Sequence, residues 1–262
     1  IGTYDPELDL LYWTTGNPAP DWNGDARLGD NLFSDSVLAI NPDTGERVWY
    51  YQFTPHDVWD YDGNSHLFQA DLEENGQTIK ALVQANRNGF FYAINRTNGE
   101  FIRATSYMEQ LNWADSMEPN GRPVVNPDAM PNEEPTFRIC PGVFGGMNGS
   151  VSGSLNPELG LAFIPVIESC QLMQKGISMH VEGQLFFGGL PIPVDLEPNE
   201  EGEWPAYGHI SAVDYSTGDI AWRYYDPQPM MAGTLSTAGG LVFTGSQTGH
   251  ALGLNAETGD VV

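Results

Sequence analysis

Two aspartates stand two residues apart in the segment Trp59-Asp60-Tyr61-Asp62-Gly63, flanked by aromatic residues and followed directly by a glycine. On a strand, such positions lie on one face, and in a tight loop their side chains can converge on one point. Two carboxylates at close range repel each other unless a cation lies between them or one of them keeps its proton. The pair therefore predicts a site for a hard metal ion, or a general base beside a metal.

The overall charge of the chain limits which partners can approach these acids. The 262 residues include 10 Lys and Arg against 35 Asp and Glu, which gives a formal net charge of −25. A surface of this charge repels nucleic acid and anionic membranes, and it attracts cationic partners and metal ions. We therefore expect no nucleic-acid partner, although solubility or a saline habitat would also explain most of the charge. No run of about 18 apolar residues occurs, so no membrane span is predicted.

The elements that must position these acids are predicted by an internal repeat. An apolar pair is followed by Asn or Asp, a short polar turn and a glycine, after which a strand begins. This is the pattern of a β-hairpin, in which the Asn or Asp caps the turn and the glycine adopts a positive φ. The glycines of the four copies are Gly45, Gly99, Gly218 and Gly259. Four residues after the glycine stands Trp49 in the first copy, Arg103 in the second and Trp222 in the third.

Repeats of this length, with several short strands in each, predict a β-propeller. We predict an all-β fold in which residues 1–262 form one partial propeller domain of about four to five blades. The segments 108–137 and 175–207 are too long and irregular for blade turns. Long insertions on one face of a propeller usually build or cover its site, so we expect both to lie near function.

The only cysteines are Cys140 and Cys170, which are 30 residues apart and form no Cys-x-x-Cys pair. This spacing argues against a zinc knuckle. It is equally compatible with a disulfide in an oxidising compartment and with two buried free thiols.

Three segments in this order resemble the pyrroloquinoline quinone (PQQ) dependent alcohol dehydrogenases, namely residues 15–20 (Thr-Gly-Asn-Pro-Ala-Pro), 55–63 (Pro-His-Asp-Val-Trp-Asp-Tyr-Asp-Gly) and 86–92 (Asn-Arg-Asn-Gly-Phe-Phe-Tyr). The Trp-ended repeat resembles the tryptophan-docking motif of eight-bladed quinoprotein propellers. The resemblance covers nearly the whole chain, as the C-terminal half of such an enzyme. Since the chain also lacks an initiator Met and stops at Val262 within a repeat, we expect it to be part of a longer protein. The family's metal-binding glutamate and the tryptophan beneath its quinone would precede Ile1, so this part alone should be inactive.

The resemblance implies a role for each residue of the metal site. Asp60 matches the catalytic aspartate, which takes the hydroxyl proton of the alcohol and contacts the metal. Asn17 matches an amide that ligates the metal, and Asp62 matches the extra carboxylate of lanthanide-dependent members. Calcium-dependent members usually have a small residue at that position, so a lanthanide is expected and calcium is the alternative.

The resemblance also implies contacts to the quinone and a disulfide. Arg87 matches the basic residue beside the quinone carbonyls, and Asn148 matches a side chain that hydrogen-bonds the cofactor. Met231 stands where relatives carry a tryptophan near the cofactor, so we assign it to the cofactor's surroundings. Cys140 and Cys170 stand where methanol dehydrogenases carry a disulfide, which favours a bridge over free thiols.

The function implied is the oxidation of a primary alcohol, such as methanol or ethanol, to an aldehyde in the periplasm, with PQQ as cofactor and a c-type cytochrome as electron acceptor. A homodimer is a further expectation. No haem-binding Cys-x-x-Cys-His occurs in the chain, so any haem would belong to another part or protein. One alternative is a non-enzymatic propeller scaffold of the cell envelope, which would not need Asn17, Asp60, Asp62 and Arg87 together. Another is an enzyme of the same fold that acts on sugars or polymeric alcohols.

Overall fold

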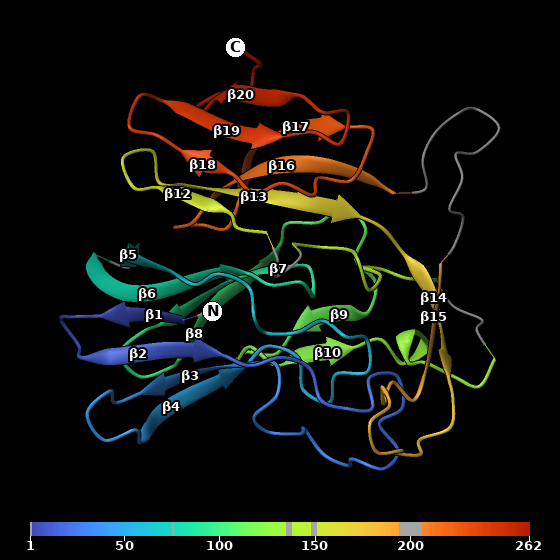
Figure 1. The fold of residues 1–262 in the computed structure, drawn as a ribbon. Coiled ribbons are helices and arrows are strands. Elements are labelled where there is room, and N and C mark those ends of the chain that lie inside the picture. The colour runs from blue at the N-terminus through green and yellow to red at the C-terminus, as the bar shows by residue number, and fades with distance from the viewer. Residues whose placement is uncertain (1, 75, 135–137, 148–150, 194–205) are drawn as a thin grey trace.

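Four antiparallel sheets succeed one another along the chain and lie one above the other (Figure 1). The structure is a computed structural model that describes residues 2–74, 76–134, 138–147, 151–193 and 206–262. The first sheet consists of β1 (Gly2–Asp5), β2 (Leu10–Thr14), β3 (Ser36–Ile40) and β4 (Arg47–Gln52). The second consists of β5 (Phe68–Glu74), β6 (Gln77–Ala85), β7 (Phe90–Asn95) and β8 (Phe101–Ser106).

The third sheet consists of β12 (Ser154–Asn156), β13 (Leu161–Glu168), β16 (Tyr207–Asp214) and β17 (Ile220–Asp226). The fourth has three strands, β18 (Leu235–Ser236), β19 (Leu241–Gly245) and β20 (Ala251–Asn255). In each sheet the strands pair in the order in which they occur in the chain, as in the blades of a propeller. The all-β prediction is confirmed, and the number of blade-like sheets lies at the lower end of the range expected.

Both segments that the sequence marks as insertions carry small structures outside these four sheets. In the first, β9 (Ala114–Met117) pairs with β10 (Pro123–Val125), and the short 3-10 helix η1 (Pro127–Ala129) follows. A further sheet joins β11 (Arg138–Ile139), β14 (Gln171–Lys175) and β15 (Gly189–Pro193) beside the stack (Figure 1). Within the described part of the chain, no helix is long and apolar enough to cross a membrane.

The predicted hairpin turns are confirmed in all four copies of the repeat. In the first copy, the side-chain oxygen of Asn41 accepts hydrogen bonds from the backbone N–H groups of Asp43 and Thr44 at 2.9 and 3.0 Å. The N–H of Gly45, whose φ is +74°, donates to the backbone oxygen of Asn41 at 2.8 Å. The equivalent caps in the other copies are Asn95, Asp214 and Asn255. A purely local pattern of residues therefore determines these turns.

The tryptophans of the repeat dock neighbouring sheets against each other. The Trp49 ring, at the end of the first sheet, covers Gly99 of the second so closely that a Cβ there would lie 2.7 Å from a ring carbon. Trp222 of the third sheet covers Gly259 in the same way, at 2.6 Å. Between the second and third sheets, where Arg103 replaces the tryptophan, its guanidinium donates to the backbone oxygen of Ser216. Gly99 and Gly259 are thus required both by their turns and by the tryptophans docked on them.

The hydrophobic core is divided into three layers, one between each pair of successive sheets. The first layer is the largest, because it also receives side chains from the segment after β8, above all the fully buried Trp113. In this layer lie the aromatic residues of the segment that carries the two candidate acids, Trp59 and Tyr61. The core between the first two sheets therefore also supports the candidate site.

Candidate active site

The loop between β4 and β5 carries the two candidate acids, and Asp57 determines its shape. One carboxylate oxygen of Asp57 accepts a hydrogen bond from the N–H of Trp59 and the other from the N–H of Tyr61, both at 2.8 Å. These two hydrogen bonds fold the backbone tightly, and Asp60 and Asp62 adopt positive φ values of +65° and +58°. Asn and Asp tolerate this conformation better than most residues. The side chains of Trp59 and Tyr61 are buried, whereas those of Asp60 and Asp62 remain partly exposed.

Arg87 brings these two acids together from the neighbouring sheet. It lies in the turn between β6 and β7, and its guanidinium is largely buried. One terminal nitrogen lies 3.0 Å from a carboxylate oxygen of Asp62, and the other lies 3.5 Å from one of Asp60. The sequence-predicted residues Asp60, Asp62 and Arg87 therefore form one cluster, although Arg87 is separated from the acids by a complete strand pair.

Asn17 reaches the same cluster from the segment after β2. Its backbone N–H donates to a carboxylate oxygen of Asp62 at 3.1 Å. Gly16 precedes it, and a Cβ there would lie 2.7 Å from the same oxygen, so the close approach of this segment requires glycine. Burial raises the pKa of Asp21, and the nearby Asn17 side chain opposes this rise.

The site has an excess of negative charge. Burial raises the pKa of Asp60 to about 7; the nearby Arg87 opposes this rise and Asp62 adds to it. Burial, together with the charge of Asp57, raises the pKa of Asp21 to about 6. Carboxylates crowded in this way favour a proton or a cation among them.

Asp35 and Asp57 form a second, deeper pair of acids beneath the loop. Both side chains are fully buried. Burial and the neighbouring Asp57 raise the pKa of Asp35 well above its usual range, and burial also raises the pKa of Asp57. The guanidinium of Arg27 donates to the backbone oxygen of Asp57 at 2.5 Å and so reinforces the loop.

Asp21, Asp35 and Asp57 also lie at this site and are not among the residues predicted from the sequence. The sequence could have indicated Asp57, because an Asp side chain in a turn commonly accepts a hydrogen bond from the backbone N–H two residues further on. Asp21 and Asp35 had no such signal. Their burial comes from segments distant in sequence.

Two predicted cofactor contacts lie apart from this cluster or outside the described residues. Met231 lies in the connection from β17 to β18, where its side chain is 51% exposed, and its role at the cofactor stays a prediction. Asn148 falls among residues that the structure does not describe.

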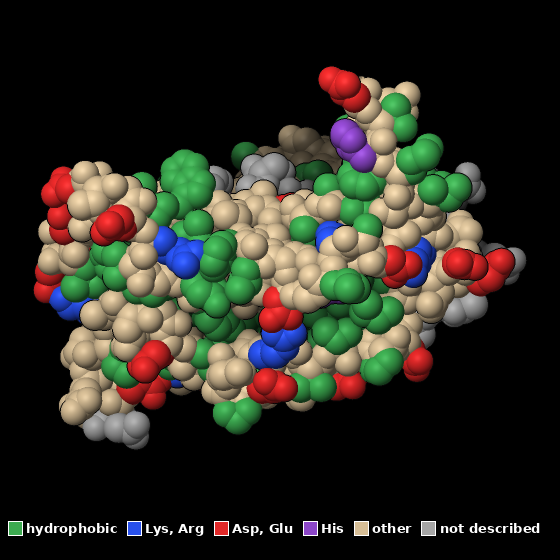
Figure 2. Space-filling model, turned by 90° about the horizontal axis from the view of Figure 1, so that it is seen from below, with side chains coloured by type: hydrophobic (Ala, Val, Ile, Leu, Met, Phe, Trp, Pro, Cys, Tyr) green, Lys and Arg blue, Asp and Glu red, His purple; other side chains and the backbone are tan. Residues whose placement is uncertain are grey.

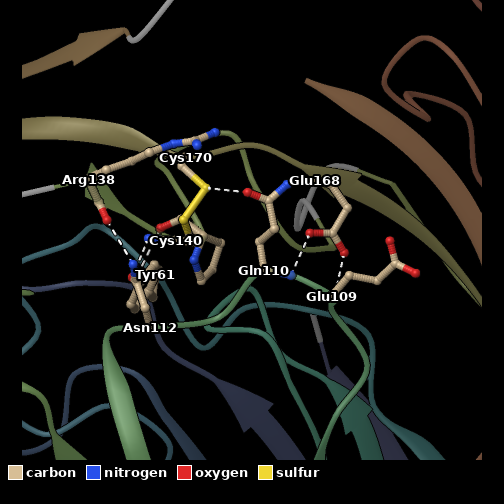
Figure 3. The surroundings of a disulfide bond; sticks show 9 residues. Tyr61, Glu109, Gln110, Asn112, Arg138, Cys140, Glu168 and Cys170 are labelled. Carbon is tan, nitrogen blue, oxygen red and sulfur yellow. Dashed lines mark hydrogen bonds between the residues drawn. A yellow bond between two sulfur atoms is a disulfide. The ribbon is translucent and has the colours of Figure 1, made fainter. Parts of the chain in front are cut away.

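The predicted disulfide between Cys140 and Cys170 is present, with their Cα atoms 4.4 Å apart (Figure 3). On one side, the N–H of Cys140 donates to the side-chain oxygen of Asn112 at 2.7 Å. On the other, the carboxylate of Glu168 accepts from the N–H groups of Glu109 and Gln110 at 2.7 and 3.1 Å. The bridge and these bonds therefore fasten the start of the first insertion.

The disulfide also reaches the acid-bearing loop. The hydroxyl of Tyr61, which stands between Asp60 and Asp62, donates to the backbone oxygen of Pro141 at 3.0 Å. Pro141 directly follows Cys140, and Figure 3 shows Tyr61 next to the bridge. The loop that carries the candidate acids is thus held from below by the first insertion and by the segment around the disulfide.

The donors of this site suit a hard cation. Asp60 and Asp62 offer carboxylate oxygens and Asn17 offers an amide oxygen, which are the ligand types that such ions prefer. Within the described residues, no three His, Cys, Asp or Glu side chains converge as a metal-binding group. The buried Nε of Arg87 has no hydrogen-bond partner among the described residues, so it remains able to donate to a ligand.

Comparison with known proteins identifies relatives of this chain. Residues 1–109 match the family model of the glucose/ethanol/alcohol dehydrogenase β-propeller domain. The quinoprotein alcohol dehydrogenase PedH of Pseudomonas putida is 37% identical, and the match covers 100% of this chain and 44% of the relative. The lanthanide-dependent methanol dehydrogenase of Methylacidiphilum fumariolicum is 34% identical, over 99% of this chain and 42% of the relative. The chain thus spans less than half the length of these relatives.

Comparison of the fold with solved structures identifies relatives of the same kind. A europium-containing methanol dehydrogenase superimposes with a TM-score of 0.90 at 32% identity, covering 100% of this chain and 45% of the other. The quinohemoprotein alcohol dehydrogenase of Comamonas testosteroni superimposes with a TM-score of 0.89 at 30% identity. The four sheets are therefore blades of a partial quinoprotein β-propeller, as the sequence predicts. The chain belongs to the family of PQQ-dependent alcohol and methanol dehydrogenases.

Proposed function

We propose that the full-length protein that contains this chain oxidises primary alcohols to aldehydes with PQQ and a hard metal ion. The observation that carries this proposal is the cluster of Asp60, Asp62 and Arg87, in which two carboxylates lie 3.5 and 3.0 Å from one guanidinium. Here two acids share one arginine, and further acids stand behind them.

Asp60 is the proposed general base. Its carboxylate is partly exposed, so an alcohol hydroxyl can reach it. Its pKa, raised to about 7 by burial, lies where a base accepts a proton efficiently near neutral pH. When bound, the quinone supplies the hydride acceptor and the metal ion supplies a Lewis acid. Arg87 is the proposed donor to oxygen atoms that gain negative charge, since its guanidinium stays charged and is fixed in place by Asp62.

The metal proposed is a lanthanide, held in part by Asn17, Asp60 and Asp62. A trivalent ion gains more from each added carboxylate than calcium does, because the attraction scales with the product of the charges. The 34% identical relative from Methylacidiphilum fumariolicum is described as lanthanide-dependent, which supports this choice. Calcium is the alternative, and further ligands would come from other parts of the full-length protein.

The electron acceptor proposed is a c-type cytochrome, and the location proposed is the periplasm. With a formal net charge of −25, the chain would attract a basic partner over a long range at low ionic strength. Relatives such as ADH IIB of Pseudomonas putida, 38% identical, are described as quinohemoproteins, which supports a haem acceptor for this chain as well.

Reconstitution tests the proposal. The full-length apoprotein is loaded with PQQ and either La³⁺ or Ca²⁺, and the reduction of an artificial electron acceptor is followed with methanol, ethanol or glucose. We expect turnover with a primary alcohol only when both PQQ and a metal ion are present, and faster turnover with La³⁺. Turnover without quinone would contradict the proposal, as would a preference for glucose over every alcohol.

A further inference from the structure

Trp113, from the first insertion, lies between the two loops that carry the candidate catalytic groups. Its side chain is fully buried. Its indole N–H donates to the backbone oxygen of Asn88 at 2.7 Å, and Asn88 directly follows Arg87. Tyr107 anchors the same turn from the other side, because its hydroxyl donates to the backbone oxygen of Asn86 at 2.7 Å. Trp113 of the first insertion and Tyr107, which directly precedes that insertion, therefore fix the backbone on both sides of Arg87.

The same indole ring also contacts the acid-bearing loop. The ring centroids of Trp59 and Tyr61 lie 5.0 and 5.2 Å from that of Trp113, at tilted angles typical of favourable aromatic pairs. Trp59 and Tyr61 stack on each other, with their planes 16° apart. Three aromatic rings thus form one packed unit beneath the loop.

The position of this unit determines where the two acids point. Trp59 and Tyr61 alternate along the chain with Asp60 and Asp62, and the aromatic side chains are buried while the acids face outward. Any shift of the two rings therefore moves both carboxylates. Two further bonds hold the rings from the same insertion and from the disulfide segment: Trp59 Nε1–H to the oxygen of Ala129 at 2.7 Å, and the Tyr61 hydroxyl to that of Pro141.

We propose that Trp113 is a positioning residue that sets the acids at 60 and 62 and the guanidinium at 87 relative to one another. This inference rests on the proposed function for its importance to turnover, but not for the geometry itself. Misplacing reacting groups by about 1 Å can lower a rate by about 100-fold, so a residue that touches neither substrate nor cofactor can still control the reaction. The first insertion then contributes to the site through the buried side chain of Trp113.

Hydrogen exchange measures this positioning without any need for activity. We expect Trp113→Phe in the full-length apoprotein to accelerate amide exchange in both segments 57–63 and 86–92. The matched control is Trp222→Phe, which loses an equivalent indole bond to a backbone oxygen, that of Ala256 at 3.0 Å. The control should accelerate exchange around residues 255–260 and leave both site segments unchanged. Unchanged exchange at either site segment in Trp113→Phe would overturn the proposal.

A second variant keeps the test decisive should Trp113→Phe fail to fold. Tyr61→Phe retains the aromatic stack and removes only the hydroxyl bond to Pro141. Exchange should then accelerate in segment 57–63 but not in segment 86–92, since the bond from Trp113 to Asn88 is intact. Equal acceleration in both segments would contradict the attachment of segment 86–92 through Trp113.

Kinetics on the loaded enzyme add a readout that a general loss of stability would not produce. In Trp113→Phe we expect kcat to fall by about 10-fold or more, with KM for the alcohol changed by less than about 3-fold. Trp222→Phe should lower thermal stability to a similar extent while kcat stays unchanged. Equal kcat values for the two variants would overturn the positioning role. If the wild type oxidises no alcohol but exchange responds as expected, the proposed function fails and the positioning of the loops stands.

Discussion

Asp57 lets two neighbouring acids face the same side of one short loop. Because its two oxygens accept the N–H groups of Trp59 and Tyr61, the intervening Asp60 and the following Asp62 adopt positive φ. Asp62 then has two partners, the N–H of Asn17 and the guanidinium of Arg87, at 3.1 and 3.0 Å. Asp60 has the longer contact to that guanidinium. The two acids are thus distinguished by their surroundings, one held firmly and one left freer to exchange a proton.

The charge of Asp62 can be separated from its hydrogen bonding. Asp62→Asn retains an oxygen that accepts the N–H of Asn17 but loses the negative charge. We expect the affinity of the full-length protein for La³⁺ to fall by at least about 10-fold, and that for Ca²⁺ to fall less, because attraction scales with ionic charge. Isothermal titration of the PQQ-loaded protein measures both affinities.

The control for this prediction is Asp71→Asn. Asp71 also contacts an arginine, Arg96, at 3.0 Å, but it lies on β5 away from the cluster. Its loss should change neither affinity. Equal affinities for La³⁺ in Asp62→Asn and in the wild type would contradict the assignment of Asp62 to the metal.

The buried acid Asp35 gives the stability of the protein a defined dependence on pH. Since its pKa is raised in the folded state by burial and by Asp57, the folded state binds more protons than the unfolded state between the two pKa values. Stability from this group is therefore present at low pH and is lost as pH rises above the unfolded value of about 3.9. In Asp35→Asn this loss is absent. We expect its free energy of unfolding to exceed that of the wild type by an amount that grows by at least about 1 kcal/mol from about pH 5 to about pH 8.

Urea unfolding of the full-length protein at several pH values measures this difference. The exposed acid Asp219 provides the control, because Asp219→Asn removes a carboxylate that faces solvent instead of a buried one. A constant difference for Asp35→Asn would show that no proton is held in the buried pair.

At this scale the motifs of the sequence predict which residues lie together, and their roles stay predictions. Asp60, Asp62, Arg87 and Asn17 were all predicted, and the structure brings Asp60, Asp62 and Arg87 into one cluster with the backbone of Asn17. Asp35 was not predicted, since nothing in its own segment indicates that the turn after β2 and the loop after β4 bury it together. Trp113 was not predicted either, because its partners lie in two other loops.

At two of the three junctions between successive sheets, a tryptophan docks on a glycine of the next sheet. Gly45 and Gly99 occupy the same position of the same turn, with φ values of +74° and +77°. A Cβ at Gly45 would meet nothing within 4 Å, whereas one at Gly99 would lie 2.7 Å from the ring of Trp49. A substitution at Gly45 therefore tests only the need for a positive φ in the turn, whereas one at Gly99 also tests the contact with Trp49.

This pair yields a prediction about stability. Gly45→Ala should lower the free energy of unfolding by about 1 to 2 kcal/mol, the cost of a left-handed conformation for a residue with a Cβ. Gly99→Ala should cost a further amount of about 1 to 3 kcal/mol, because the added methyl group also displaces the indole. Chemical unfolding of both variants tests this. Equal losses would mean that the contact between Trp49 and Gly99 contributes nothing to the joining of the sheets.

The elements that the sequence predicted well are those with local causes. The four turns follow from an Asn or Asp and a glycine within a few residues, and all four form as expected. The two insertions were recognised only as irregular segments. Their small sheets depend on distant pairings, such as that of β11 with β14, which no local pattern contains.

The first and fourth sheets, at the two ends of the stack, carry apolar faces that no described residue covers. On the first sheet, Tyr4, Trp13, Val48 and Tyr50 are between 40 and 56% exposed, and Trp13 and Tyr50 both share a row with Leu38. The first sheet is the lowest in Figure 1, and Figure 2, a view from below, shows hydrophobic side chains gathered in patches there. On the fourth sheet, the cross-strand partners Leu235 and Phe243 are exposed as well. Single surface apolar residues are common, but clusters of this kind mark contact surfaces.

These faces predict how the 262-residue chain behaves when it is produced alone. Its apolar faces favour association between copies, whereas a net charge of −25 opposes it. Salt screens that repulsion, with a Debye length of about 8 Å at physiological ionic strength. Light scattering after gel filtration should therefore give a mass above that of one chain that increases with NaCl. The variant Trp13→Glu should remain closer to one chain, and a monomer at all salt concentrations would show that the faces do not associate.

We propose that Asp60 is the catalytic base of a quinoprotein alcohol dehydrogenase, and the variant Asp60→Asn of the full-length protein tests this role. The substitution keeps the size of the side chain and removes its ability to take a proton. We expect PQQ to remain bound, as its absorption spectrum would show, while kcat for a primary alcohol falls by about 100- to 10,000-fold. A kcat equal to that of the wild type, with PQQ and the metal ion bound, would contradict the account.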